Sequence, residues 1–477
     1  MKIFLTAIAL ILFSANFCVT NAQNTYWTEE GNYDTSWYDE TKNEYHIGNA
    51  RELAGLAVLS AIPSIDYESG GLEGPNKYFQ NKTIKLTSDI DLSGHLWLPM
   101  ELNGAVFDGD GYTISGMTIH ITQGTASQSY GFCSLCHTIK NLVIGENSEI
   151  VIPSGITVDY VGGIGGICND IDNCINNAVI NVTRAIGTDL SIGGIVGYAY
   201  EITDCVNNGS ITVFSRSGSI GGIMGGSGNV SGHRKVDGCI NNGYISITNS
   251  LEDNGYSIAV AGITPNYGNE RAVVINCGNT GNISLEGYST NYGSSMINAF
   301  GISQYTPAKN CYNTGLLKVK GSNGNSASNI VAYDCENCYS TAGITVENVS
   351  NFDVWSSSYK FGINQSKFCY LSSDVIGITG ATVIDNMKSQ EFCDLLNRNL
   401  SEIKYVGLRQ WILGENGYPV ISHGDDNSGI DDVYFDIPRK LNGIYLLDGR
   451  RLNDISNLSD GQIYIKDGVK YIKRSNY

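Results

Sequence analysis

The sequence predicts an all-β protein, a right-handed parallel β-helix, and three observations support this fold class. Glycine and tyrosine are abundant, with 57 and 29 copies in 477 residues, while charged residues make up only 16%. One segment type recurs at intervals of 27 to 38 residues. Each copy contains short stretches in which apolar and polar residues alternate. Because such a unit cannot bury its apolar face alone, we expect successive units to stack as coils.

Six cysteines mark the repeat, and asparagine follows most of them at a fixed distance. The cysteines are Cys174, Cys205, Cys239, Cys277, Cys311 and Cys338. Two residues after the first five stand Asn176, Asn207, Asn241, Asn279 and Asn313. Glycine or alanine comes two residues later, and Asn with Gly is typical of turns because both tolerate left-handed backbone angles. We therefore expect a turn here, with a ladder of asparagine amides and a column of thiols running from coil to coil.

Two further positions of the repeat are always aliphatic and are separated by one polar residue. The first of them is occupied by Ile180, Ile211, Ile245, Ile283, Leu317 and Ile344. This alternation is the pattern of a strand with one buried face, so we expect these side chains to form one inward stack. A glycine-rich apolar strand opens each unit. Three short strands per unit fit the spacing better than the four longer strands of a β-propeller blade.

The repeat resembles the GLUG repeats of bacterial surface proteins. The segments Ile192–Gly197 and Cys205–Val213 carry the likeness, with a Gly-Gly-hydrophobic strand followed by Cys-x-Asn-x-Gly and two aliphatic positions. Phe107–Ile114 resembles the first coil of that family, and Met387–Ile421 its closing segment. The resemblance covers roughly residues 40–422 and implies a β-helix that is secreted, often by Bacteroidota. It implies no settled biochemical activity.

The chain divides into six expected parts. These are a signal peptide over 1–22, an N-terminal cap with the first strands over 23–105, the parallel β-helix over 106–350, its C-terminal cap over 351–422, a linker over 423–428, and a small β-module over 429–477. Lys2 and the short apolar run that follows it are typical of an export signal cleaved after Ala22, which predicts a secreted or outer-surface protein. The bulky Phe17 before Cys18 fits lipoprotein processing poorly.

Two short helices and a shortened sorting signal complete the expected organisation. Residues 49–61 and 388–399 have helical apolar spacing, with Asn49 and Ser389 as candidate N-caps, and would cover the open ends of the coils. The alternating segments from Gly443 onward resemble the C-terminal sorting domain of the type IX secretion system in a shortened form. A plain C-terminal β-hairpin is the alternative interpretation.

Composition and motifs exclude several classes of function. A net charge of −18 argues against a nucleic-acid partner or an anionic membrane surface, and no later apolar run is long enough for a transmembrane segment. We expect no catalytic residues, no cofactor and no metal site, because the six histidines show no ligand spacing. Asp170 and Asp172 alternate on one strand, which leaves a carbohydrate-active β-helix enzyme as an alternative.

Two Cys-x-x-Cys motifs have the spacing of zinc or redox sites. They are Cys133–Cys136 and Cys335–Cys338, about two hundred residues apart in different coils. Cys338 already belongs to the repeat column, and Cys335 stands where other units have Ile or Val. Buried structural thiols or a cystine are therefore the stronger interpretation.

Surface loops offer the remaining candidates for binding. Tyrosines there can hold a glycan or a protein by stacking and hydrogen bonding. The candidates are Tyr198, Tyr200, Tyr267, Tyr288 and Tyr292. We therefore predict a secreted or surface-displayed binding and adhesion protein whose ligand is a glycan or an extracellular protein. A carbohydrate-active enzyme and a purely structural stalk are the alternatives, and the sequence leaves the oligomeric state open.

Overall fold

The structure is a computed structural model with two compact units, Met1–Gly424 and Asp425–Tyr477. It describes residues 25–61, 78–121, 129–183, 190–215, 217–226, 234–249, 258–265, 272–287, 297–304, 306–321, 325–331, 334–347, 366–375 and 381–422, with four short strands beyond residue 440. The predicted signal peptide and the 423–428 linker lie outside these residues. Within the described residues, no helix is both long enough and apolar enough to span a membrane.

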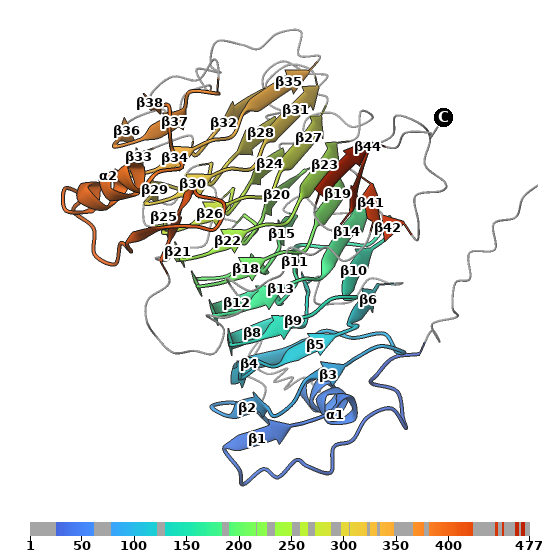
Figure 1. Ribbon diagram of the computed structural model, residues 1–477. Coiled ribbons are helices and arrows are strands. Elements are labelled where there is room, and N and C mark those ends of the chain that lie inside the picture. The colour runs from blue at the N-terminus through green and yellow to red at the C-terminus, as the bar shows by residue number, and fades with distance from the viewer. Residues whose placement is uncertain are drawn as a thin grey trace, which may run out of the picture. The chain divides into compact units, whose positions relative to one another are not determined.

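The first unit is an all-β parallel β-helix with four sheets running along its length (Figure 1). The sheets contain 12, 11, 8 and 7 strands. We name them sheets 1 to 4 in the order in which one coil crosses them. For one coil these crossings are β12 (Gly165–Asp172), β13 (Ile175–Asn176), β14 (Val179–Thr183) and β15 (Ser191–Gly193).

The other strands repeat this pattern from coil to coil. Sheet 1 also contains β1 (Glu44–Ile47), β2 (Thr83–Leu86), β4 (Met100–Asp108), β8 (Cys133–Lys140), β16 (Val196–Tyr198), β17 (Glu201–Thr203), β21 (Arg234–Asp237), β25 (Ala272–Ile275), β29 (Ala308–Lys309), β33 (Cys335–Glu336) and β36 (Ser366–Lys367). Sheet 2 also contains β3 (Ile90–Asp91), β5 (Thr113–Ser115), β9 (Val143–Ile144), β18 (Val206–Asn207), β22 (Ile240–Asn241), β26 (Gly278–Asn279), β30 (Tyr312–Asn313), β34 (Tyr339–Ser340), β37 (Tyr370–Ser372) and β38 (Thr382–Ile384).

Sheets 3 and 4 complete each coil. Sheet 3 also contains β6 (Thr118–His120), β10 (Glu149–Ile152), β19 (Ile211–Ser215), β23 (Ile245–Asn249), β27 (Ile283–Gly287), β31 (Leu317–Gly321) and β35 (Ile344–Glu347). Sheet 4 also contains β7 (Ser129–Tyr130), β11 (Tyr160–Gly162), β20 (Gly218–Gly221), β24 (Ile258–Ala261), β28 (Ile297–Phe300) and β32 (Asn325–Ser328). Four strands cross each of the middle coils and not the three that the spacing predicts, because the strands of sheet 2 are too short to show an alternating pattern.

The boundaries of the β-helix also differ from the prediction of 106–350. Strands β1, β2 and β4 begin sheet 1 before residue 106, and β36 continues it after residue 350. Sheet 2 likewise extends to β38 at residue 384. Part of each predicted cap therefore belongs to the β-helix itself.

The aliphatic column of the repeat lies in register inside the coils. Ile180 pairs with Ile211, Ile211 with Ile245 and Ile245 with Ile283, and the column continues to Leu317 and Ile344. All but the last of these side chains are buried. Their stacking gives the single continuous core that no unit could form alone.

The asparagine column forms a buried ladder of side-chain amides. Asn176 Nδ2 donates to Asn207 Oδ1 at 3.0 Å, and the same bond continues through Asn241, Asn279 and Asn313 at 2.9, 2.8 and 2.8 Å. These residues occupy the short strands of sheet 2 and not a left-handed turn, which corrects the expected conformation. The bend that follows is held by the side chains, as Asn207 Nδ2 also donates to Gly209 O at 3.0 Å.

The left-handed residue of each coil stands just before the column cysteine. Positive φ angles of 51 to 68° occur at Asn173, Asp204, Gly238, Asn276, Asn310 and Asn337. The side chains of the last three form a second ladder, with Asn310 donating to Asn276 at 2.9 Å and Asn337 to Asn310 at 2.8 Å. We call this set of six residues the turn column.

The six cysteines of the repeat form a column of buried free thiols. Each Sγ donates to a backbone carbonyl within its own coil, as Cys277 does to Ile275 O at 3.1 Å and Cys311 to Lys309 O at 3.2 Å. Burial raises the pKa of the thiols of Cys205, Cys239, Cys277 and Cys311 well above its usual value. The thiolate, which is the reactive form, is therefore suppressed.

We expect the column thiols to resist alkylation in the folded protein. Incubation with iodoacetamide at pH 8 should leave these six residues unmodified, whereas the same treatment in denaturant should label them all. Peptide mass spectrometry measures both states. Rapid labelling of most column cysteines without denaturant would contradict the inward column.

Helix α1 (Ala50–Ser60) begins where the sequence predicts and covers the start of the coils (Figure 1). Asn49 caps it by accepting a hydrogen bond from Glu52 N at 3.0 Å, and Glu52 in turn accepts from Gly48 N at 2.7 Å. Leu53 and Leu56 are fully buried and belong to the main core. The helix thus closes an end that would otherwise expose apolar side chains.

Helix α2 (Gln390–Leu400) has the predicted extent but a different location. It packs against the outer surface of sheet 2 at the last coils and not over the end of the β-helix. Phe392 contacts the rings of Tyr339 and Tyr370 edge-on, each at 5.5 Å. Trp411, on the antiparallel pair β39 (Trp411–Leu413) and β40 (Pro419–Ile421), joins the same separate apolar cluster.

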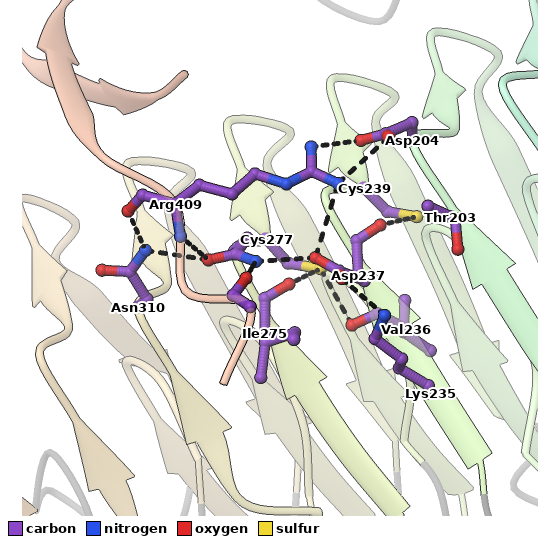
Figure 2. A network of polar contacts seen from close by, with 12 residues as sticks. Thr203, Asp204, Lys235, Val236, Asp237, Cys239, Ile275, Cys277, Asn310 and Arg409 are labelled. Carbon is purple, nitrogen blue, oxygen red and sulfur yellow. Dashed lines mark hydrogen bonds and ion pairs between the residues drawn. The ribbon is translucent and has the colours of Figure 1, made fainter. Parts of the chain in front are cut away.

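The segment after α2 binds along the turn column, and Arg409 is its main contact (Figure 2). The guanidinium of Arg409 makes a two-pronged ion pair with Asp204 and lies 3.7 Å from Asp237 Oδ1. Its backbone N–H donates to Asn276 Oδ1 at 3.0 Å, and its carbonyl accepts from Asn310 at 2.9 Å. Gly238 leaves room for the guanidinium, since a Cβ there would lie 2.6 Å from Arg409 Nη1.

We expect Arg409→Ala to lower the free energy of unfolding by about 1–3 kcal/mol, because it removes charge-assisted hydrogen bonds from a partly buried site. A double-mutant cycle with Asp204→Ala, measured by urea unfolding, gives the coupling energy between the two side chains. Arg398→Ala, at an exposed arginine of α2, is the matched control. A coupling energy near zero would show that the contact adds nothing to stability.

The second unit contains a small antiparallel β-sheet. Its strands are β41 (Ile444–Leu446), β42 (Arg451–Leu452), β43 (Ile463–Lys466) and β44 (Val469–Ile472), in the order β42-β41-β43-β44. The β-structure agrees with the alternating pattern from which we predicted a module there.

Candidate functional site

The outer surface of sheet 1 carries a group of polar and aromatic side chains around β12 and β17. Two consecutive side chains face outward at the same place in successive coils. On β12, Cys168 and Ile171 point into the core, and Asn169 and Asp170 between them face outward. The next coil places Tyr200 and Glu201 outward at the corresponding position, because Tyr200 N donates to Asn169 O at 2.9 Å and Asp170 pairs with Glu201.

Three tyrosines flank these polar groups. Tyr160 and Tyr198 have ring centroids 6.1 Å apart, and Tyr198 contacts Tyr200 edge-on at 5.6 Å. Tyr160 belongs to β11 and Tyr198 to β16, so two neighbouring coils contribute to the group. We call Tyr160, Asn169, Asp170, Tyr198, Tyr200 and Glu201 the outer patch.

The carboxylates of this surface lie close together. Asp170 and Glu201 are in register on adjacent strands, a separation of about 4.8 Å along the stack. Burial raises the pKa of Asp170, and Glu201 raises it further, while His137 lowers it. The pKa of the neighbouring Asp172 is also raised, first by burial and then by Asp204. Both groups therefore hold protons more readily than an ordinary exposed aspartate.

A histidine on the preceding coil contacts the patch. His137, on β8, lies 2.8 Å from Asn169 Nδ2 through its Nδ1 atom. Because the amide nitrogen can only donate, the acceptor is the unprotonated Nδ1 of the ring. The contact fixes the orientation of the Asn169 amide.

The structure corrects one of the predicted loop tyrosines and places another. Tyr198 is only 6% exposed and lies on strand β16, so it is not a loop residue. Tyr200 is half-buried between β16 and β17 and presents part of its ring to solvent. Tyr267, Tyr288 and Tyr292 lie outside the described residues.

The two Cys-x-x-Cys motifs are far apart. Cys133 and Cys136 lie on β8, whereas Cys335 lies on β33, and five strands of sheet 1 separate β8 from β33. Cys136 forms a disulfide with Cys168 of the next coil. Among the residues that the structure describes, no group of three His, Cys, Asp or Glu side chains could hold a metal ion.

Tyr160, Asn169, Glu201 and His137 were not predicted as a group from the sequence. The signal was present, however, because Cys136, Cys168 and Ala199 are aligned inward positions and two outward residues follow each of them. Aligning the repeats on those positions brings His137, Asn169 and Tyr200 into one column. An alignment of the repeats on the later cysteine does not show this column, because the loop between the two positions varies in length.

Comparison with known proteins adds little. No known protein family and no curated protein matches this sequence. A solved structure from Bacteroides ovatus, provisionally described as an immunoglobulin A1 protease, is similar at 14% sequence identity and a TM-score of 0.32, over 82% of this chain and 95% of that chain. Values this low give no information about activity or ligand. The strand pairing itself identifies the chain as an all-β parallel β-helix protein.

Proposed function

We propose that the protein is a secreted or surface-displayed binding protein that recognises a glycan through the outer patch. The observation that carries the proposal is the grouping of the half-buried rings of Tyr160 and Tyr200, which both contact the buried Tyr198, with the in-register carboxylates on the outside of sheet 1. Sugar rings stack on aromatic faces, and their hydroxyl groups donate to carboxylate and amide oxygens. The predicted signal peptide fits a ligand outside the cell, and the net charge of −18 argues against a nucleic acid as that ligand.

A glycan array probed with the purified full chain tests this proposal. Tyr200→Ala and Glu201→Gln should each weaken binding to any glycan found by about tenfold, because each removes a contact worth about 1–1.5 kcal/mol. Tyr244→Ala is the matched control, since Tyr244 is 43% exposed and lies between β22 and β23, outside sheet 1. If glycan binding is unchanged in both patch variants, the outer patch is not the binding site. Binding only to an extracellular protein would overturn the glycan assignment.

A carbohydrate-active enzyme is the second candidate, and the raised pKa of Asp170 and Asp172 favours it. A carboxyl group with a raised pKa is better suited to act as a general acid beside a second carboxyl group such as that of Glu201. Reducing-end and unsaturated-product assays on a panel of polysaccharides test this reading. Turnover that is lost in both Asp170→Asn and Glu201→Gln would establish an enzyme, and its absence on every substrate would leave the binding protein.

A further inference from the structure

Three buried thiols gather at the last coils of the β-helix. Cys335 lies on β33, Cys338 follows after the left-handed Asn337, and Cys369 comes from the next coil. Cys335 Sγ and Cys369 Sγ are 3.1 Å apart, and Cys369 also donates to Cys335 O at 3.3 Å. Cys335 is fully buried, and Cys369 is 4% exposed.

The strand register brings these residues together. Tyr339 pairs with Tyr370, so Cys338 and Cys369, which precede them, are consecutive members of the cysteine column. Cys335 occupies an inward position on sheet 1 that is aliphatic in the six preceding coils. The equivalent residues are Ile139, Ile171, Ile202, Val236, Val274 and Ala308. Of these equivalent positions, only Cys335 carries a thiol.

This pair combines backbone hydrogen bonds with a direct sulfur–sulfur contact. The other column thiols donate to backbone carbonyls, for example Cys239 to Asp237 O at 3.4 Å and Cys277 to Ile275 O at 3.1 Å. Cys369 likewise donates to Lys367 O at 3.5 Å, and its sulfur also lies 3.1 Å from Cys335 Sγ. A closure of about 1 Å would bring the two Sγ atoms to the bonding distance of a disulfide, and side-chain rotation can supply a movement of that size.

We propose that Cys335 and Cys369 form a second disulfide when the chain folds in an oxidising compartment. The oxidant is a small-molecule or protein disulfide, such as glutathione disulfide or the disulfide of a thiol oxidase. The Cys369 thiolate attacks one oxidant sulfur, forms a mixed disulfide and releases one thiol. The Cys335 thiolate then attacks Cys369 Sγ and releases the second thiol. Two protein thiols are oxidised, and one oxidant disulfide is reduced to two thiols.

The disulfide between Cys335 and Cys369 must form before the two thiols are buried. Burial raises the pKa of the Cys369 thiol, so little thiolate exists once the last coil has closed. Exchange therefore takes place before closure, while the segment that carries β37 is still reaching its partner strand. The bond then joins this coil to the preceding one next to Tyr370, against which α2 packs.

Peptide mapping of the non-reduced full chain, refolded with glutathione disulfide, tests the proposal. Trypsin separates Cys369, in the peptide Phe368–Lys388, from Cys335 and Cys338, and a second protease that cleaves after Glu336 separates those two from each other. We expect a linked peptide pair containing Cys335 and Cys369, with Cys338 free to be alkylated in denaturant. Three free thiols, or a bond that uses Cys338, would overturn the assignment.

Thermal stability gives an independent readout. Reduction with dithiothreitol should lower the Tm of the wild type by more than that of Cys335→Val, because the variant retains only the Cys136–Cys168 bond. Valine occupies the same position at Val236 and Val274, so the variant should fold. Cys338→Ser keeps the proposed pair and should respond to reduction like the wild type. Equal Tm shifts in Cys335→Val and the wild type would contradict the proposal.

Discussion

Replacing Ile245 by Asp should prevent the middle coils from folding, whereas the same change one residue later should be nearly neutral. Ile245 is fully buried and stacks between Ile211 and Ile283. An aspartate there would bury an unpaired charge, which costs several kcal/mol. The whole free energy of unfolding of a domain is typically about 5–15 kcal/mol. Since each coil is stabilised mainly by its two neighbours, the loss cannot be shared along the stack.

Ser246 is the matched control because its side chain points the opposite way. It is half-buried and stands between Thr212 and Ser284 on the outer surface of sheet 3. Ser246→Asp should change the free energy of unfolding by no more than about 0.5 kcal/mol. Urea unfolding followed by circular dichroism, together with the yield of soluble protein, compares the two variants. Similar unfolding midpoints would show that Ile245 does not face a dry core.

The parts of the fold that repeat were predictable from sequence, and those that do not repeat were not. Columns such as Ile211–Ile245–Ile283 follow from spacing alone, because a stacked unit must place like residues over one another. The two-residue strands of sheet 2 escaped prediction, since alternation needs a longer segment to become visible. Turns are predicted there because Asn-x-Gly is typical of turns, whereas in this fold the same residues form a short strand of sheet 2 and the bend that follows it.

The contact between the segment after α2 and the turn column could not be predicted from the repeat. Arg409 and Asp204 are 205 residues apart, and a single arginine in a non-repeating segment carries no spacing signal. One clue existed in Gly238, which interrupts a column otherwise made of Asn and Asp. Because Gly238 has no side chain, the guanidinium of Arg409 fits beside it. The outer patch was found only in part for a related reason, since its members come from separate strands of adjacent coils.

The asparagine ladder is expected to fix the register of the coils, and Asn241→Asp should reveal its strength. An aliphatic column alone would tolerate a slip of two residues, because Ile and Val recur at alternate positions. A slip of the ladder would instead leave buried amides without partners. Asn241 accepts from Asn207 at 2.9 Å and donates to Asn279 at 2.8 Å and to Gly243 O at 3.1 Å. Aspartate has the same shape but cannot donate when it is ionised.

The variant should lose about 3–5 kcal/mol of unfolding free energy at pH 7. Its carboxylate would face the oxygens of Asn279 and Gly243, and this repulsion together with burial raises its folded pKa above the unfolded value of about 3.9. The gap to the wild type should therefore be smallest below the unfolded pKa. It should widen by up to about 1.4 kcal/mol per pH unit as the pH rises toward the folded pKa.

Asn242→Asp separates the ladder from a general effect of added charge. Asn242 is exposed, donates to Asn208 at 2.9 Å on the outside of the same turn, and accepts from Thr280 at 2.6 Å. A carboxylate there keeps the acceptor role, and solvent hydrates it, so the unfolding midpoint should stay near that of the wild type at both pH 4 and pH 7. The urea unfolding midpoints of the wild type, Asn241→Asp and Asn242→Asp at these two pH values test this prediction. A pH-independent gap for Asn241→Asp, or equal losses at the two positions, would mean that the buried amides do not specify the register.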